Sequence, residues 1–166
     1  MAVSIRVATP NDAERIRDVH LRSIEELGGQ AYSETQVEAW AHDRDPGEYP
    51  IETETTHVLV AEDDAVLGFG WLRYDAGEHL QALVDGEIVA VYVHPSAARR
   101  GVGSQLYSAL EAEADRRGLE LLGLWASLNA VPFYKTHGYD RVTDHALELR
   151  AGVELTVTEL RKRLFP

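Results

Sequence analysis

The stretch VAVYVHPSAARRGVGSQLYSAL, Val89–Leu110, joins an apolar run to an amphipathic helical pattern through a loop with two arginines and two glycines. The run from Val89 to Val93 is rich in β-branched residues, which favours a strand. After Gly103 the apolar residues recur at helical spacing. A strand that enters a helix through a glycine-containing loop leaves free backbone amides at the first helical turn, and an anion can bind there.

The loop residues themselves favour a phosphate ligand. Arg99 and Arg100 bring positive charge, while Gly101 and Gly103 let the backbone come close to a bound molecule. A dinucleotide fingerprint would need a third glycine where Leu106 stands, and a Walker loop would need Gly-Lys-Ser/Thr, so both are excluded. The residues alone leave a second interpretation open, in which the glycines form a tight turn and the arginines are solvated.

Residue patterning along the chain predicts a mixed sheet with helices on both faces. Apolar or alternating runs predict strands at residues 4–8, 57–62, 65–74, 86–93 and 119–127, and a closing hairpin at 145–162. Helical patterns begin after Thr9, after Ser33, near Gly103 and near Ala130. Ser33 and Gln36 form a capping-box pattern. The fold class is therefore α/β (α+β), with a mixed, mostly antiparallel central sheet.

Length and composition limit the classes of function. A chain of 166 residues fits one domain and buries roughly 70% of the surface that its unfolded form exposes. Hydrophobic residues make up 45% and charged residues 27%, as in ordinary globular proteins. The 28 acidic and 16 basic side chains give a formal net charge of -12, which argues against binding a nucleic acid over a broad surface.

Several kinds of site are absent from the sequence. The chain has no cysteine, so disulfides, thiolate metal sites and a cysteine nucleophile are excluded. Neither an H-x-x-x-H motif nor a carboxylate cluster points to a metal. No stretch approaches the roughly 18 apolar residues that a membrane-spanning helix needs, and the segment Met1–Pro10 has no apolar leader. We expect a cytoplasmic protein with no metal and no membrane partner.

Motifs on both sides of the loop resemble the GCN5-related N-acetyltransferase family. They are YVHP before the loop and NAVPFYKTHGY, Asn129–Tyr139, after the next strand. The family's acetyl-CoA signature, Arg/Gln-x-x-Gly-x-Gly/Ala, reads Ala98-Arg99-Arg100-Gly101-Val102-Gly103 here, so its first position departs from the pattern. The resemblance covers Ile5 to about Val142 and implies that residues 1–166 form one N-acetyltransferase domain.

The resemblance implies a binding mode for acetyl-CoA as the acetyl donor. Backbone amides of the loop would hold the pyrophosphate, and the edge of the preceding strand would pair with the pantetheine arm where the fourth and fifth strands splay apart. The family has an asparagine seven residues before its donor tyrosine; Ser127 stands there and Asn129 is displaced by two. The implied cofactor-binding residues are Val91, Tyr92, Val93, Arg99, Arg100, Gly101, Val102, Gly103, Ser104, Ser127, Asn129 and Tyr134.

Two residues are candidates for proton transfer, because an amine attacks a thioester as the free base and the departing thiolate needs a proton. Tyr134 resembles the family's proton donor; its alternative role is a core aromatic. Glu87 resembles the base of the histone-acetylating branch. It shares strand parity with Val91 and Val93, which predicts that it faces the same side as they do. The alternative for Glu87 is an exposed residue at the strand entry.

Other residues are weaker candidates. His94 precedes a proline in a loop and reads as structural, while His79, His137 and Tyr32 have no spacing argument as bases. By the resemblance, the first two helices and the loop between them wall the acceptor pocket, so Tyr32 and Trp40 are expected substrate residues, although Trp40 at helical spacing also fits a core position. Glu87, as the expected base, is the third expected substrate residue. The acidic surface favours cationic acceptors such as polyamines.

Two further alternatives concern class and assembly. A non-catalytic coenzyme A sensor on the same fold would keep the glycines and lose the proton-handling residues. A nucleotide-dependent kinase is excluded, since its loop lysine and magnesium-binding Ser/Thr are missing. The strand in GVELTVTEL, Gly152–Leu160, has an edge that would pair with a second copy, so a homodimer is one option.

Overall fold

A mixed sheet of seven strands forms the centre of the part that the computed structural model describes, residues 3–42 and 44–164. The order across the sheet is β1-β2-β3-β4-β5-β7-β6, and β4 and β5 form its parallel pair. This confirms the expected mixed, mostly antiparallel sheet. The strands are β1 Ser4–Val7, β2 Thr56–Glu62, β3 Val66–Arg73, β4 Gly86–Val93, β5 Leu121–Ser127, β6 Asp140–Glu148 and β7 Glu154–Arg163.

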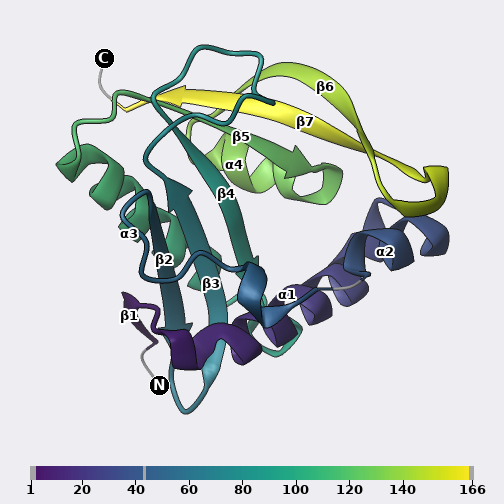
Figure 1. Ribbon diagram of the computed structural model, residues 1–166, viewed down its shortest axis with the longest axis horizontal. Helices are drawn as coiled ribbons and strands as arrows, with labels where there is room; N and C mark the ends of the chain where they lie inside the picture. The colour runs from purple at the N-terminus through teal and green to yellow at the C-terminus, as the bar shows by residue number, and fades with distance from the viewer. Residues whose placement is uncertain (1–2, 43, 165–166) are drawn as a thin grey trace.

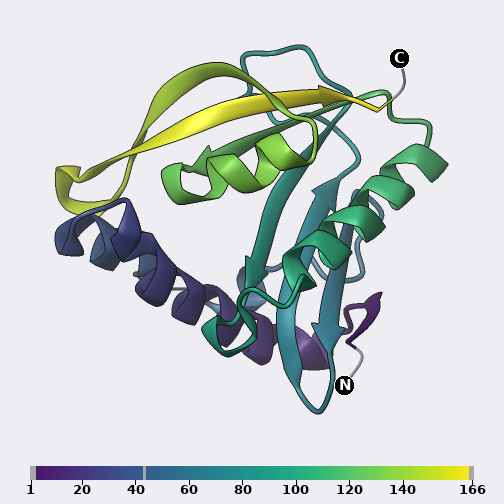
Figure 2. The ribbon, with the colours of Figure 1, turned by 180° about the vertical axis from the view of Figure 1, so that it is seen from behind.

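Helices cover both faces of the sheet, as the patterning predicted. They are α1 Ala13–Leu27, α2 Glu34–Ala41, α3 Val102–Arg116 and α4 Val131–Thr136. Figures 1 and 2 show α1 across one face and α3 across the opposite one. Ile16 and Val19 of α1 pack with Phe69 of β3, whereas Leu106 and Leu110 of α3 lie in a second core cluster. Among the described residues, no helix is long and apolar enough to cross a membrane.

Local sequence signals set the ends of the helices. The Ser33 amide donates to Gln36 Oε1 at 2.9 Å and the Gln36 amide donates to Ser33 Oγ at 3.2 Å, so the predicted capping box starts α2. Helix α3 begins at Val102, one residue earlier than expected, and is followed by Gly118, whose φ of +77° suits glycine. These starts and stops need no tertiary partner, which is why the sequence shows them.

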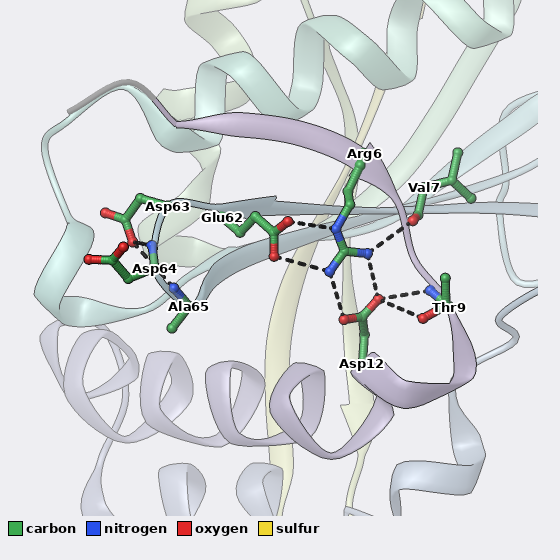
Figure 3. Close-up of polar contacts among 8 residues, drawn as sticks. All are labelled: Arg6, Val7, Thr9, Asp12, Glu62, Asp63, Asp64 and Ala65. Atoms are coloured by element: carbon green, nitrogen blue, oxygen red, sulfur yellow. Dashed lines mark hydrogen bonds and ion pairs between the residues drawn. The ribbon is translucent and has the colours of Figure 1, made fainter.

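Arg6 ties the first strand and first helix to the sheet (Figure 3). Its guanidinium donates to both carboxylate oxygens of Asp12, at 2.8 and 2.9 Å, and to both of Glu62, at 2.8 and 3.1 Å. Asp12 also accepts from the Thr9 amide at 2.8 Å and so orders the turn before α1. A planar guanidinium forked between two carboxylates fixes their relative positions. The N-terminal end of α1 is therefore held against β2.

The C-terminal hairpin differs from the prediction in one respect. Strand β7 lies between β5 and β6 and pairs with both, so the edge of Gly152–Leu160 is not free. The expectation that this edge is open to a second copy was wrong, because β6 forms the outer strand at this end of the sheet, and the homodimer itself stays a prediction. Charged side chains at Asp140, Arg141, Asp144 and Glu148 lie along β6 and disfavour pairing with another strand.

Candidate active site

The two central parallel strands separate soon after they begin. Strands β4 and β5 pair only at Gly86–Leu122 and Glu87–Gly123 within the described residues. Beyond Glu87, β4 keeps its partners on β3 but loses those on the β5 side. Figure 1 shows β4 and β5 running apart. The expected splay between the fourth and fifth strands is confirmed, and it leaves backbone donors and acceptors of β4 open to a ligand.

A cavity of about 190 Å³ occupies this splay. We call it the splay cavity. Its walls bring together residues of α1, α2, β4, the start of α3, the end of β5 and α4. The sequence-predicted residues that line it are Trp40, Val91, Tyr92, Val93, Gly103, Ser127, Asn129 and Tyr134. Segments far apart in the chain therefore meet at the place where the pantetheine arm was expected.

Tyr134 enters the splay cavity from α4. Its side chain is buried against the rings of Tyr107, Phe133 and Tyr139. Burial raises the pKa of Tyr134 well above its usual value, so the hydroxyl keeps its proton throughout the neutral range. Within the described residues we find no hydrogen bond made by this hydroxyl, whereas Tyr107 donates to Tyr139 at 3.1 Å. Tyr134 is thus a packed core aromatic and also a protonated group at the cavity wall.

Asn129 brings an unpartnered acceptor to the same cavity. Its Oδ1 atom is buried and has no hydrogen-bond partner in the part of the chain that the structure describes. A buried acceptor left without a donor costs about 1–3 kcal/mol, which a ligand N–H would recover. Ser127 also lines the cavity, so Ser127 and Asn129, the two residues predicted to contact the pantetheine arm, both lie at the splay cavity. Amide groups such as those of a pantetheine arm match this requirement.

The loop before α3 has the backbone of an anion site. Arg99 and Gly101 both take positive φ angles, 65° and 76°, and Gly101 is the N-cap residue of α3. Helical geometry leaves the amides that follow, from Val102 to Ser104, without partners inside the helix. The Arg100 Nη2 atom lies 3.7 Å from Asp63 Oδ2 in the β2–β3 turn, where Asp63 also accepts from the Asp64 amide. Arg100 is therefore partly engaged by the protein itself.

Histidines near this loop have local roles. His94 Nδ1 accepts from the Ser96 amide at 3.1 Å and caps the short turn after β4. His137 Nε2 lies 3.2 Å from Ser104 Oγ, and its ring packs on Tyr107. The structural interpretation of His94 from the sequence agrees with this geometry.

Glu87 faces a different side from the one that strand parity predicted. Trp71 pairs with Ala90 and Leu72 pairs with Ile88, so Val89 has no partner on β3 and forms a β-bulge. The bulge reverses the alternation of side chains along β4. As a result, Glu87 shares its face with Ala90 and Tyr92, while Val91 and Val93 face α3. The parity argument was wrong because a bulge depends on the pairing of two strands.

Glu87 is nevertheless buried, with only 4% of its surface exposed, so the alternative of an exposed strand entry is wrong. One carboxylate oxygen, Oε2, lies 2.7 Å from His79 Nε2. The other, Oε1, lies 3.7 Å from Arg73 Nη1 and has no hydrogen-bond partner among the described residues. Burial raises the pKa of Glu87, although His79 and Arg73 oppose the shift. Glu87 does not line the splay cavity or the second cavity described next.

A second cavity, of about 300 Å³, lies on the α1 face and shares Trp40 and Tyr92 with the splay cavity. We call it the aromatic cavity. His20 lines it, with Nδ1 2.9 Å from the Tyr49 hydroxyl, and burial together with nearby Arg44 lowers the pKa of His20 to about 3. The remaining walls are Arg44, Glu48, Trp71, Val89 and Ala90.

Sequence reasoning missed most of the aromatic cavity. His20 stands four residues after the core residue Ile16, so helical spacing could have placed it on the buried side of α1. For Arg44 and Tyr49, which lie in the segment after α2, the sequence offered no periodic signal. Trp71 belongs to a predicted strand, but its face could not be assigned without the bulge opposite it.

Tyr32 and Trp40, which with Glu87 were expected at the acceptor pocket, have different surroundings. Trp40 lines both cavities. The Tyr32 hydroxyl donates to the Thr156 carbonyl at 2.6 Å and accepts from the Leu128 amide at 2.8 Å. Tyr32 lies on an outer groove between α1 and α2, not on either cavity. Its hydroxyl thus holds the helices to the C-terminal hairpin.

Comparison with known proteins agrees with this geometry. A model of the acetyltransferase (GNAT) family matches residues 21–139, which include the loop before α3 and the residues that line the two cavities, apart from His20. The chain belongs to this family. The prediction that residues 1–166 form one acetyltransferase domain reaches beyond the matched range and stays a prediction.

Individual relatives support the assignment of this acetyltransferase. An uncharacterized N-acetyltransferase of Bacillus subtilis (strain 168), YjcF, is 34% identical over 103 residues, which are 62% of this chain and 68% of the relative. A GCN5-related N-acetyltransferase from Rhodopseudomonas palustris is 31% identical with a TM-score of 0.82, covering 98% of both chains. The putative acetyltransferase yncA from Salmonella typhimurium, solved with acetyl-CoA, shares the fold at 21% identity and a TM-score of 0.71, covering 99% and 95%.

The left-handed backbone at Arg99 leads to a prediction about stability and ligand affinity. A non-glycine residue at this φ is strained, so Arg99→Gly should raise the free energy of unfolding by about 0.5–1 kcal/mol. Arg99→Ala keeps the strain and removes the same charge. Both variants should bind coenzyme A several-fold more weakly in calorimetry, while only Arg99→Gly gains stability in urea unfolding. Equal stability of the two variants would contradict the strain argument.

Proposed function

We propose that the protein transfers an acetyl group from acetyl-CoA to a primary amine by direct attack of the amine on the thioester. The observation that carries the proposal is the splay cavity, where the open edge of β4, the unpartnered Asn129 Oδ1 and protonated Tyr134 meet. Membership of the GNAT family and the likeness to a fold solved with acetyl-CoA support this choice of donor.

The binding role falls to the backbone. Free amides at the start of α3, with Arg99 beside them, suit the pyrophosphate of acetyl-CoA. Val91 and Val93 offer unpaired strand groups to the pantetheine arm, and Asn129 accepts from one of its amides. Ala98, the departure from the family signature, leaves these backbone contacts intact.

Proton transfer is divided between two sides of β4. Tyr134, which remains protonated, donates to the departing sulfur within the splay cavity. The amine enters through the aromatic cavity. Its proton passes to the buried pair Glu87–His79 on the same face of the sheet. Because Glu87 lines neither cavity, this transfer goes through water. The raised pKa of Glu87 suits a base that works near neutrality.

The test of the proposed function is thiol release from acetyl-CoA in the presence of a panel of amines. We expect acetyl-CoA to raise the melting temperature of the purified protein and at least one amine to give saturable thiol release. Acetyl-CoA binding without release by any amine would favour the alternative, a non-catalytic coenzyme A sensor. Absence of any thermal or calorimetric response to acetyl-CoA would overturn both.

Tyr134→Phe tests the proton donor. The ring packing is kept and the hydroxyl is lost, so we expect kcat to fall about 10²-fold while the Kd for acetyl-CoA changes little. Tyr139→Phe is the matched control, because Tyr139 packs on Tyr134 but its hydroxyl is bound to Tyr107 and it does not line the splay cavity. An unchanged kcat for Tyr134→Phe would remove it as the donor.

Glu87→Gln tests the base through the pH profile. Because the base works deprotonated, wild-type kcat/KM should rise with pH as Glu87 loses its proton at its raised pKa. In the Gln variant, kcat/KM should be lower by about 10²-fold and should no longer rise with pH in this range. His79→Ala should shift the rise to higher pH, since His79 lowers the pKa of Glu87. A Glu87→Gln profile identical in shape to that of the wild type would rule Glu87 out.

A further inference from the structure

Within residues 3–42 and 44–164, two hydrogen-bond donors at the aromatic cavity lack partners. The Nε1 atom of Trp71 and the Nε atom of Arg44 are both buried and unbonded, and both side chains line the cavity. Buried donors without acceptors are uncommon in native proteins, and the exceptions call for an explanation. Both side chains line the aromatic cavity, so a ligand that entered it would lie beside them.

The positions of both donors are set by other contacts. Arg44 Nη2 donates to the Trp40 carbonyl at 3.0 Å, which holds the guanidinium just after α2. Trp71 is held in β3 by its pairing with Ala90, and its ring lies 6.5 Å from that of Tyr49, edge to face. The two donors therefore belong to side chains with fixed anchors, as a preorganised site requires.

The wall of the aromatic cavity carries one cationic side chain, Arg44, and one carboxylate, Glu48. His20, with its lowered pKa, is neutral, and burial raises the pKa values of Tyr49 and Tyr92 to about 12, so both keep their protons. Glu48 accepts from the Asp45 amide at 2.6 Å and caps a turn. Arg44 thus remains as the charged group with a free donor.

We propose that the aromatic cavity binds an acceptor that carries a carboxylate as well as its amine, so that the substrate class is free amino acids or similarly small aminocarboxylates. Arg44 and the Trp71 N–H hold the carboxylate, and the rings of Tyr49 and Tyr92 flank the rest of the molecule. A volume of about 300 Å³ is at the small end of ligand sites. This inference rests on the proposed function and replaces the polyamine-like acceptors that the acidic surface suggested.

Matched pairs of amines test the proposal. Each common amino acid and its C-terminal amide differ in the carboxylate, and spermidine represents the cationic class. With the wild-type protein and acetyl-CoA, we expect thiol release for at least one amino acid with kcat/KM tenfold or more above that of its amide. Preference for spermidine or for the amides would overturn this inference and leave the proposed function standing.

Three variants locate the selectivity. Arg44→Gln should lower kcat/KM for the amino acid at least tenfold and leave that of the amide within twofold. Trp71→Phe keeps a ring and removes the N–H, so a smaller loss confined to the amino acid is expected. Arg17→Gln is the charge-matched control, because Arg17 lies in the adjoining hollow and not on the aromatic cavity. Equal losses for acid and amide in Arg44→Gln would count against carboxylate recognition.

A binding measurement separates this inference from catalysis. N-acetylated amino acids, the expected products, should raise the melting temperature of the wild type more than their amides do, and this difference should vanish in Arg44→Gln. A protein that binds acetyl-CoA but shows neither turnover nor this difference would overturn the substrate class. One that fails to bind acetyl-CoA would overturn the proposed function first.

Discussion

The loss of pairing between β4 and β5 beyond Glu87 and Gly123 is the constraint on which the site depends. Unpaired strand groups are costly in a protein interior, so a sheet that opens here needs a ligand or solvent to satisfy them. The flanking elements are arranged around the opening: α3 begins just after β4 ends, and α4 places Tyr134 beneath it. One core cluster packs against each face of the sheet, and together they stabilise the sheet around the opening.

The bulge at Val89 lets one strand serve both sides of the sheet. Before the bulge, Ile88 packs toward α3; after it, Val91 and Val93 do so, while Ala90 and Tyr92 turn toward α1. Without the extra residue, Glu87 would lie on the opposite side of the sheet from Tyr92. A local irregularity in the ladder therefore places the buried carboxylate on the face of the aromatic cavity.

Local chemistry could be predicted from the sequence, and long-range pairing could not. The capping box of Ser33 and Gln36, the loop before α3 and the stop at Gly118 each depend on a few adjacent residues, and all agree with the structure. The bulge at Val89 and the insertion of β7 between β5 and β6 depend on strands from distant parts of the chain. The aromatic cavity has the same origin, since it gathers α1, β3, β4 and the segment after α2. Tyr134 could be placed because its motif is compact, although its burial was open.

Trp40 and Tyr92 line both cavities, so the binding of donor and acceptor as we propose it would involve the same two side chains. A molecule that shifts either ring in one cavity changes the shape of the other. Thermodynamic linkage then requires the effect to be mutual: whatever factor the first molecule imposes on the affinity of the second, the second imposes on the first. For the proposed donor and acceptor, the shared aromatic wall is therefore a route for cooperativity, with a sign set by whether the filled cavity widens or narrows its neighbour.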